Sequence, residues 1–272
     1  MIPNVLSIAG SDPSGGAGVQ ADIKAISANG AFAMAALTAL TAQNTRGVTG
    51  IHLVPPDFVM AQINAIFTDI RVDAVKIGMI ANAEIAQAVV TTLDTRKAPV
   101  VVDPVMIAKG GAELLQADAV DVVRNQLLPQ ATLLTPNLPE AAHLLGTKTA
   151  ATRTEMEAQG RALTRCGPGA VLMKGGHLDG PDSPDCLVTG QDVRWFESPR
   201  TKTRNTHGTG CTLSSALAAQ LAKGQDLPAA VTAAKRYVTS AIARADDLAV
   251  GHGHGPTHHF AAFYADVEGT HA

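Results

Sequence analysis

The sequence of 272 residues has few aromatic side chains and few cysteines. Phe, Trp and Tyr make up only 3% of the chain, so a hydrophobic core must be built from Ala, Val, Leu and Ile. The cysteines are Cys166, Cys186 and Cys211. An odd and sparse set of this kind does not form a disulfide framework, which favours a reducing compartment. We therefore expect a cytoplasmic protein.

Clusters of basic residues and membrane-spanning runs are also missing. The net charge is -3, and a nucleic-acid surface needs clustered Lys and Arg to neutralise phosphates, so we expect no nucleic-acid partner. The apolar run at residues 5–10 follows no Lys or Arg, unlike a signal peptide. Residues 25–45 are uncharged and long enough for a span, but polar side chains interrupt them. We interpret this stretch as a buried helix end followed by a buried strand, and expect no membrane partner.

Two nucleotide-binding motifs are excluded. No Gly-Lys-Ser or Gly-Lys-Thr occurs, so there is no P-loop. Residues 16–21 match the dinucleotide fingerprint, but that motif requires an acidic residue about 20 positions further on, and none lies between Asp22 and Asp57.

Residues 251–259 contain His without neighbouring Cys or acidic ligands, so a structural or lid segment is favoured over a metal site.

Short apolar runs alternate with longer segments of helical periodicity. This alternation predicts an α/β fold with a mainly parallel sheet covered by helices on both faces. No linker or repeat divides the chain, so we expect one domain over residues 1–272. The predicted strands cover residues 4–9, 32–41, 73–79, 99–103, 131–135, 170–174, 186–189 and 193–196, the last two as a polar hairpin. The predicted helices cover residues 17–29, 56–67, 83–93, 117–128, 139–145, 154–166, 210–222 and 228–245.

Polar and Gly-rich segments follow the predicted strands. Ligands of parallel sheets bind outside the carboxyl ends of the strands, so we expect these segments to converge on one rim and form an active site. They are residues 10–18, 43–47, 78–79, 103–106, 137–140, 174–177 and 206–211.

The strongest single motif is Asn205-Thr-His-Gly-Thr-Gly-Cys211, which leads into a predicted helix. Glycines let the backbone approach a ligand closely, and a helix N-terminus adds unpaired N–H groups and partial positive charge. We therefore predict an anion site for a phosphoryl group rather than an ordinary helix start. A thiol in the first turn has a lowered pKa, which makes Cys211 a candidate acid/base group or nucleophile. The alternative is a small buried hydrophobe, as we expect for Cys166 and Cys186.

Charged and amide side chains at three strand ends are candidates for nucleotide and metal binding. Asn137 and Glu140 can hold hydrated Mg²⁺ beside phosphates, although a Glu in the first helical turn is often only a cap. Asp103 ends a hydrophobic strand, where a charge is costly without a partner. Lys174 can reach a nucleotide phosphate, or can extend its amine to the surface instead.

Seven motifs together resemble those of the hydroxymethylpyrimidine/phosphomethylpyrimidine kinases, which belong to the ribokinase superfamily. They occur in order along nearly the whole chain, and several are long. They are Gly10-Ser-Asp-Pro-Ser-Gly-Gly-Ala-Gly18, Thr38-Ala-Leu-Thr-Ala-Gln-Asn-Thr45, Lys76-Ile-Gly-Met79, Val101-Val-Asp-Pro-Val-Met106, Thr135-Pro-Asn-Leu-Pro-Glu-Ala141, Met173-Lys-Gly-Gly-His177 and Asn205-Thr-His-Gly-Thr-Gly-Cys211.

The resemblance implies a three-layer α/β/α ribokinase-like fold and a homodimer. It implies a kinase of thiamine biosynthesis that uses ATP and Mg²⁺ to phosphorylate the hydroxymethyl group of 4-amino-5-hydroxymethyl-2-methylpyrimidine, and then the resulting monophosphate. Two alternatives stay open. One is a pyridoxal or pyridoxine kinase, including an enzyme that serves both pathways. The other is a catalytically inactive pyrimidine-binding protein.

The resemblance also implies roles for individual residues. Sugar kinases of the superfamily usually carry Asp where this chain has Cys211, so the thiolate is expected to take the alcohol's proton in the first phosphorylation. The other implied roles fall into four groups: Gln43 hydrogen-bonds the pyrimidine, with Gly10, Asp22, Met79 and Met106 lining the pocket; Asn137 and Glu140 serve Mg²⁺ and phosphate, with Asp103; Lys174 and Thr206 contact ATP; and Gly208, Thr209 and Gly210 form the anion hole.

Overall fold

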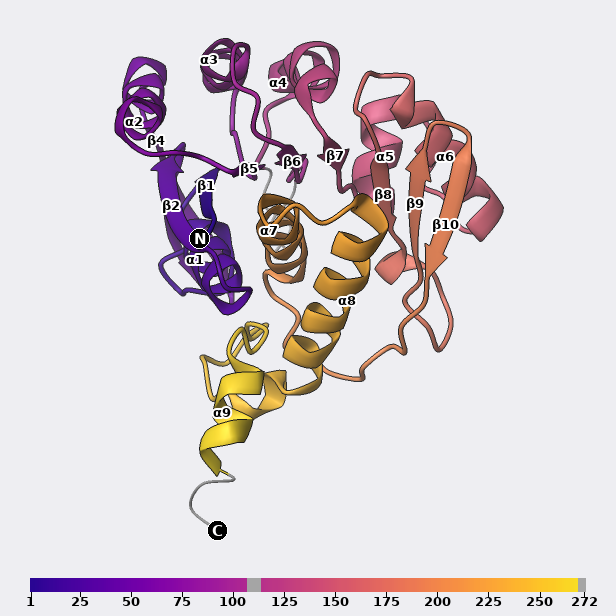
Figure 1. Cartoon of the computed structure of the whole chain (residues 1–272). Helices are drawn as coiled ribbons and strands as arrows, with labels where there is room; N and C mark the ends of the chain where they lie inside the picture. Colours follow the sequence, from indigo (N-terminus) through magenta and orange to yellow (C-terminus); the bar gives the residue numbers. More distant parts are fainter. Residues whose placement is uncertain (107–113, 269–272) are drawn as a thin grey trace.

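A computed structural model of the chain describes residues 1–106 and 114–268, and its central feature is an eight-stranded sheet (Figure 1). The strand order is β10-β9-β8-β7-β6-β5-β1-β2. The pairs from β2 to β8 are parallel, while β9 and β10 complete the sheet with antiparallel pairs. The strands are β1 (Asn4–Ala9), β2 (Phe32–Leu37), β5 (Ala74–Ile77), β6 (Val100–Val102), β7 (Leu133–Leu134), β8 (Val171–Lys174), β9 (Asp185–Thr189) and β10 (Asp192–Phe196).

Helices cover both faces of this sheet, which gives the predicted three layers. Successive strand side chains point to opposite faces, so Leu6 and Ile8 belong to one core cluster and Val5 to the other. The first cluster lies under α2 (Pro56–Asp69), α3 (Ala83–Leu93), α4 (Ala117–Val122), α5 (Leu138–Leu145) and α6 (Arg153–Thr164), and the second under α1 (Gly18–Ala28), α7 (Thr209–Ala222) and α8 (Leu227–Ala243).

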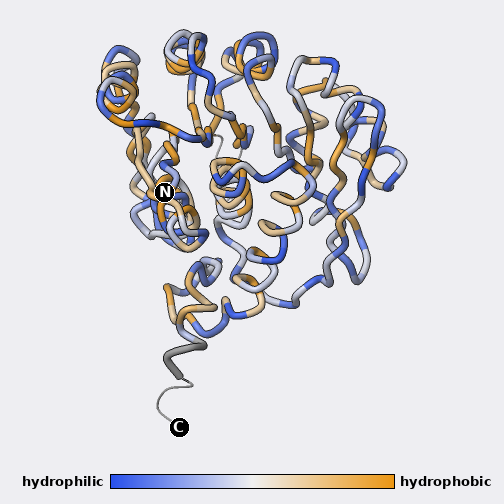
Figure 2. Tube along the Cα trace, viewed as in Figure 1, coloured by the Kyte–Doolittle hydropathy of each residue, from blue (hydrophilic) through white to orange (hydrophobic). Residues whose placement is uncertain are grey.

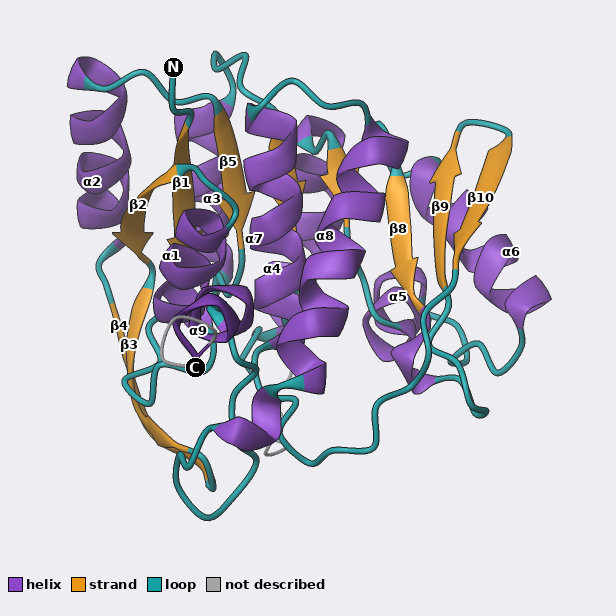
Figure 3. Cartoon of the chain, turned by 60° about the horizontal axis from the view of Figure 1, so that its bottom comes forward, coloured by secondary structure: helices purple, strands orange, loops and turns teal. Residues whose placement is uncertain are grey.

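A separate antiparallel pair, β3 (Ala39–Asn44) and β4 (Gly47–Leu53), extends away from the main sheet (Figure 3). The predicted strand over residues 32–41 is divided at Thr38, where the chain passes from β2 into β3. A bulge between Ala42 and Gln43 shifts the register of the pair. Gln43 lies within β3, rather than in the loop predicted at residues 43–47.

Other differences from prediction have local causes. Of the helix predicted over residues 117–128, only α4 is an α-helix. A π-helical turn and then a 3₁₀ turn follow it. Pro129 lies in that 3₁₀ turn, and its missing N–H does not permit a continuous helix. β9 is almost wholly buried, so the polar character predicted for the hairpin is wrong for that strand. β4 and α9 (Ala261–Glu268) were not predicted.

Helix α7 is buried on nearly all sides and consists mainly of small residues. It packs against α1, α8 and the strands β1, β5 and β6. Figure 2 shows apolar residues along the sheet strands and hydrophilic residues on the outward turns of the peripheral helices. Among the helices of residues 1–106 and 114–268, none has the length and apolar character that a membrane crossing requires.

Candidate active site

The first turn of α7 meets the carboxyl ends of β6 and β8. A Cβ added to Gly210 would lie 3.2 Å from Lys174 Nζ and 3.4 Å from Asp103 Oδ2. Gly208 has φ 77°, and a Cβ there would lie 1.7 Å from the carbonyl oxygen of Gly16, so only glycine fits. Backbone N–H groups at a helix N-terminus bind anions. This turn, which begins at Thr209, therefore suits a phosphoryl group held beside the Lys174 ammonium.

Two carboxylates share that ammonium group. Lys174 Nζ lies 2.8 Å from Asp103 Oδ1 and 3.7 Å from Glu140 Oε2. Burial opposes the charge of Lys174, but Asp103 and Glu140 hold the pKa of Lys174 above its usual value. The pKa of Glu140 is raised to about 7, mainly by burial. The charge of Lys174 partly opposes this rise, and the charge of Asp103 adds to it. Asp103 also accepts a hydrogen bond of 3.2 Å from Ser214 on α7.

Asn137 and Glu140 form the capping box of α5. Asn137 Oδ1 accepts from the Glu140 backbone N–H at 2.8 Å, and Glu140 Oε2 accepts from the Asn137 N–H at 2.7 Å. The capping alternative is therefore present in the structure. No group of three or more His, Cys, Asp or Glu in the described ranges is arranged to hold a metal. Mg²⁺ usually takes one or two carboxylates together with waters and phosphates. Asp103 and Glu140 fit such an ion only if a nucleotide supplies further ligands.

Burial outweighs the helix N-terminus at Cys211. The pKa of the thiol is raised to about 11, mainly by burial. Lys76 opposes this rise, and Asp22 and Asp103 add to it. The predicted lowering of this pKa is wrong, because a largely desolvated thiolate close to two carboxylates is disfavoured. Cys211 is therefore a neutral thiol at neutral pH.

Asp22 lies beneath α7, with no exposed surface. Both of its carboxylate oxygens lie 2.8 Å from Nζ of the fully buried Lys76. The carboxylate also accepts hydrogen bonds from Ser7 at 2.6 Å and from Ser215 at 2.8 Å. This placement does not agree with a role for Asp22 in lining a substrate pocket. It makes Asp22 an anchor between the sheet and α7.

The structure brings together two of the other predicted substrate contacts. A Cβ on Gly10 would lie 2.9 Å from Met79 Sδ, so the two residues touch. The Met79 carbonyl accepts a hydrogen bond of 2.6 Å from Thr38, at the start of the segment that carries the half-buried Gln43. Met106 belongs to the core cluster instead, and the chain that follows it, residues 107–113, lies outside the described residues.

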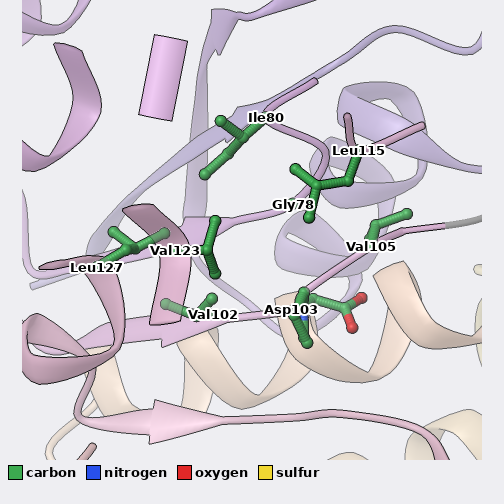
Figure 4. Close-up of a pocket in the computed structure, with 9 residues that line it drawn as sticks. Gly78, Ile80, Val102, Asp103, Val105, Leu115, Val123 and Leu127 are labelled. Carbon is green, nitrogen blue, oxygen red and sulfur yellow. The ribbon is translucent and has the colours of Figure 1, made fainter. Parts of the chain in front are cut away.

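The hollow beside β6 is too small for a ligand (Figure 4). Its cavity volume is about 10 Å³, which corresponds to at most one water molecule. Apart from Asp103, the residues labelled there are apolar or glycine: Gly78, Ile80, Val102, Val105, Leu115, Val123 and Leu127.

One pair of residues was missed, although both lie in motifs that carried the resemblance. His207 Nε2 lies 2.7 Å from Asp12 Oδ2 and 3.4 Å from Gln43 Nε2. Burial opposes ionisation of Asp12, but hydrogen bonds with His207 and Ser14 more than offset it and lower the pKa of Asp12. The two residues stand 195 positions apart. Nothing in their spacing indicates that they meet.

The His-containing segment 251–259 connects two parts of the rim. The His254 N–H donates to the Thr45 carbonyl at 2.9 Å, beside the turn between β3 and β4. Gly255 donates to Asn205 Oδ1 at 3.0 Å and accepts from the His207 N–H at 3.0 Å. These contacts support the structural role predicted for the segment. Thr206, predicted to contact ATP, lies directly before His207 in the loop that leads into α7.

The fold and the rim together define a kinase of the ribokinase-like class, in which a glycine-rich helix N-terminus lies beside the half-buried Lys174. Comparison with protein families narrows this class. The family described as phosphomethylpyrimidine kinase matches residues 12–258, and the chain belongs to that family.

Individual relatives agree with this assignment. The hydroxymethylpyrimidine/phosphomethylpyrimidine kinase of Escherichia coli (strain K12) is 53% identical to this chain, over 96% of this chain and 98% of the relative. Among solved structures, an ADP complex of Bacillus subtilis pyridoxal kinase superposes with a TM-score of 0.89 at 35% identity, covering 97% of this chain and 99% of that chain. The phosphomethylpyrimidine kinase of Clostridium difficile 630 superposes with a TM-score of 0.78 at 42% identity, covering 88% of this chain and 99% of that chain.

Proposed function

We propose that this chain is an ATP- and Mg²⁺-dependent kinase of thiamine biosynthesis. It phosphorylates 4-amino-5-hydroxymethyl-2-methylpyrimidine to the monophosphate, and the monophosphate to the diphosphate. The observation that carries the proposal is the position of Gly210 against Lys174 and Asp103, which directs the first turn of α7 and an ammonium group at one space. The name of the relative from Escherichia coli supports the substrate.

Positioning and electrostatics do most of the work in phosphoryl transfer. Gly208 and Gly210 supply backbone N–H groups for the transferred group, and Lys174 neutralises its charge. Thr209, predicted for the same anion hole, donates its N–H to the Thr206 carbonyl at 3.3 Å and so fixes the shape of this turn. Bound magnesium would add positive charge beside the phosphates, held by them and by Asp103 or Glu140. Asn137 caps α5 and thereby keeps Glu140 beside Lys174. Thr206 lies at the entrance to α7 and is proposed to contact ATP.

A proton acceptor such as Cys211 is needed in the first phosphorylation but not in the second. The alcohol must lose a proton in the first step, whereas the phosphate that attacks in the second step is already anionic. A thiol with a pKa of about 11 is rarely ionised at neutral pH. Cys211 can therefore accept the alcohol's proton only in the small fraction of molecules that hold a thiolate.

Gln43 is proposed to hold the heterocycle, with Gly10 and Met79 forming part of the wall. Gln43 touches His207, which directly precedes Gly208 in the chain. The loop that carries the phosphate cradle therefore also contacts, through His207, the β3 residue that is proposed to hold the heterocycle. Asp22 and Met106 are buried and support the site from within the core. They can contact the substrate only if they become accessible.

The second candidate is a pyridoxal kinase. The high structural similarity to Bacillus subtilis pyridoxal kinase favours it. Both alcohols are flat heteroaromatic rings that carry CH₂OH, and shape alone rejects such analogues poorly. ATP consumption with each alcohol, with products followed by phosphorus NMR, separates the candidates. A monophosphate followed by a diphosphate from the pyrimidine supports the proposal. Turnover of pyridoxal alone contradicts it, and turnover of neither indicates a binding protein.

We further propose that the protein acts in the cytoplasm as a homodimer that forms along the outer edge of β2. This strand ends the eight-stranded sheet, and unpaired edges invite pairing. Large apolar side chains are exposed on β2, β3, β4 and α2, namely Phe32, Leu40, Ile51 and Phe58. Sedimentation at micromolar concentration tests this. A dimer that Phe32→Glu dissociates agrees, and a monomeric wild type contradicts it.

A further inference from the structure

We propose that Asp12 and His207 are specificity-determining positioning residues, which set the orientation of the Gln43 carboxamide. This inference rests on the proposed function, in which Gln43 binds the heterocycle. In the structure, Gln43 Nε2 lies 3.4 Å from His207 Nε2, and Gln43 Oε1 lies 3.3 Å from Thr41 Oγ1. A half-turn of the carboxamide exchanges its oxygen and nitrogen within the same volume. The chemistry of the neighbours therefore decides which way it points.

The neighbour on one side is a hydrogen-bond donor. Asp12 Oδ2 lies 2.7 Å from His207 Nε2, and an ionised carboxylate only accepts hydrogen bonds. Backbone N–H groups of Ser14 and Ala17 also donate to Asp12, which stabilises the ionised form. His207 Nε2 therefore carries its hydrogen toward Asp12. A protonated ring nitrogen cannot accept from an amide N–H, so an amide nitrogen of Gln43 at this position would face a hydrogen without an acceptor. An oxygen at this position can instead share the single Nε2 hydrogen, which lies mainly toward Asp12 at 2.7 Å and reaches the Gln43 atom at 3.4 Å.

The neighbour on the other side is an acceptor. Thr41 Oγ1 lies 2.9 Å from the carbonyl oxygen of Ser11, which can only accept, so the single hydroxyl hydrogen is used there. Thr41 then offers Gln43 a lone pair, which requires the amide nitrogen. His207 and Thr41 thus independently select the turned orientation, with Gln43 Oε1 toward His207 and Nε2 toward Thr41.

The consequence concerns the direction of the substrate. In the turned orientation, Gln43 keeps one N–H and one oxygen lone pair for a ligand. A 4-aminopyrimidine matches them with an amino donor beside a ring-nitrogen acceptor. Its hydroxymethyl group is attached next to the carbon that bears the amino group, so the order of oxygen and nitrogen on Gln43 decides which way the alcohol points. Pyridoxal has no amino group beside a ring nitrogen and is not oriented in this way.

The hydrogen on His207 can be measured without any turnover. In the full-length protein labelled with ¹⁵N-histidine, the His207 signals are assigned by their loss in His207→Gln. A protonated Nε2 at pH 7 supports the proposal. An unprotonated Nε2, with the hydrogen on Nδ1, overturns it.

The activity test compares two replacements at the same position. His207→Gln keeps a side-chain N–H donor that can reach Asp12 and Gln43, whereas His207→Phe has none. We expect His207→Phe to raise the KM for the aminopyrimidine alcohol roughly tenfold or more, with the KM for ATP changed less than twofold. We expect a smaller rise in His207→Gln, and a preference for the pyrimidine over pyridoxal that falls only in His207→Phe.

A matched control is His254→Asn, because His254 lies in the neighbouring segment and its Nδ1 faces the carbonyl of Arg204 at 3.4 Å rather than Gln43. It should leave both KM values unchanged. Equal losses in His207→Phe and His207→Gln, or a parallel rise in the KM for ATP, would overturn the proposal. If the folded wild type phosphorylates neither alcohol, the proposed function fails, while the NMR result still decides the orientation of Gln43.

Discussion

Removal of the Lys76 side chain should destabilise the protein strongly. Lys76 is fully buried and lies 2.8 Å from both oxygens of Asp22, which is also fully buried. Among the residues that the structure describes, Lys76→Met leaves the carboxylate side chain of Asp22 with only the hydroxyls of Ser7 and Ser215 as hydrogen-bond donors. An uncompensated buried charge costs about 3–5 kcal/mol. For a chain of this size, that corresponds to a fall in Tm of roughly 6–20 °C.

Equilibrium unfolding in urea measures this loss, and a double-mutant cycle attributes it to the pair. Asp22→Asn removes the charge that Lys76 balances, so the double variant should be more stable than the sum of the two single losses predicts. The control is Arg124→Met, which removes an exposed ion pair with Asp121 and should cost less than about 1 kcal/mol. A loss below about 1 kcal/mol in Lys76→Met, or strict additivity in the cycle, would refute the reasoning.

Three further predictions concern the rim. Cys211→Ala should slow the first phosphorylation more than the second, and equal losses in the two single-turnover rates would exclude Cys211 as the base. Gly208→Ala should lower Tm and abolish most turnover, because its φ is 77° and its Cβ would overlap a carbonyl oxygen 1.7 Å away; a variant as stable and active as wild type contradicts this. Glu140 has a pKa raised from 4.5 to about 7, so the native state binds more protons than the unfolded state between these values. Its contribution to stability is therefore lost as pH rises through this window, by at most about 1.4 kcal/mol per unit. Urea unfolding at pH 5, 6 and 7 gives the free energy of unfolding as a function of pH. Glu140→Gln should make this dependence less steep, and an unchanged slope would show that other groups cause it.

The elements that local sequence determines were predicted well. α3 was predicted with its observed bounds, because its apolar periodicity is regular and Asn82 caps its first turn. The succession of most strands and helices along the chain, and the mainly parallel pairing of the sheet, followed from their alternation alone. β4 was missed because its Gly-containing, largely exposed sequence has no hydrophobic pattern, and its pairing with β3 arises from tertiary structure.

For the candidate site, the sequence predicted which segments take part better than it predicted the protonation states and partners of their side chains. The motif before α7 correctly indicated a helix start, because glycine requirements are local. The raised pKa of Cys211 could not be inferred, since it depends on burial and on carboxylates that other strands and helices supply. The partners of Asp22 and His207 were hidden for the same reason, because Ser215 and Asp12 lie far away in the sequence.

These long separations bear on the order in which the protein folds. Ser215 and Asp22 meet across 193 positions, and His207 and Asp12 across 195. Contacts of this kind form only after most loop-closure entropy has been lost, so they slow folding. A ribosome-bound chain that has released only its first strands holds Asp12, Asp22 and Gln43 without their partners. The rim should therefore be among the last parts of the molecule to form, and binding activity should appear only after α7 has entered its place between the sheet and α8.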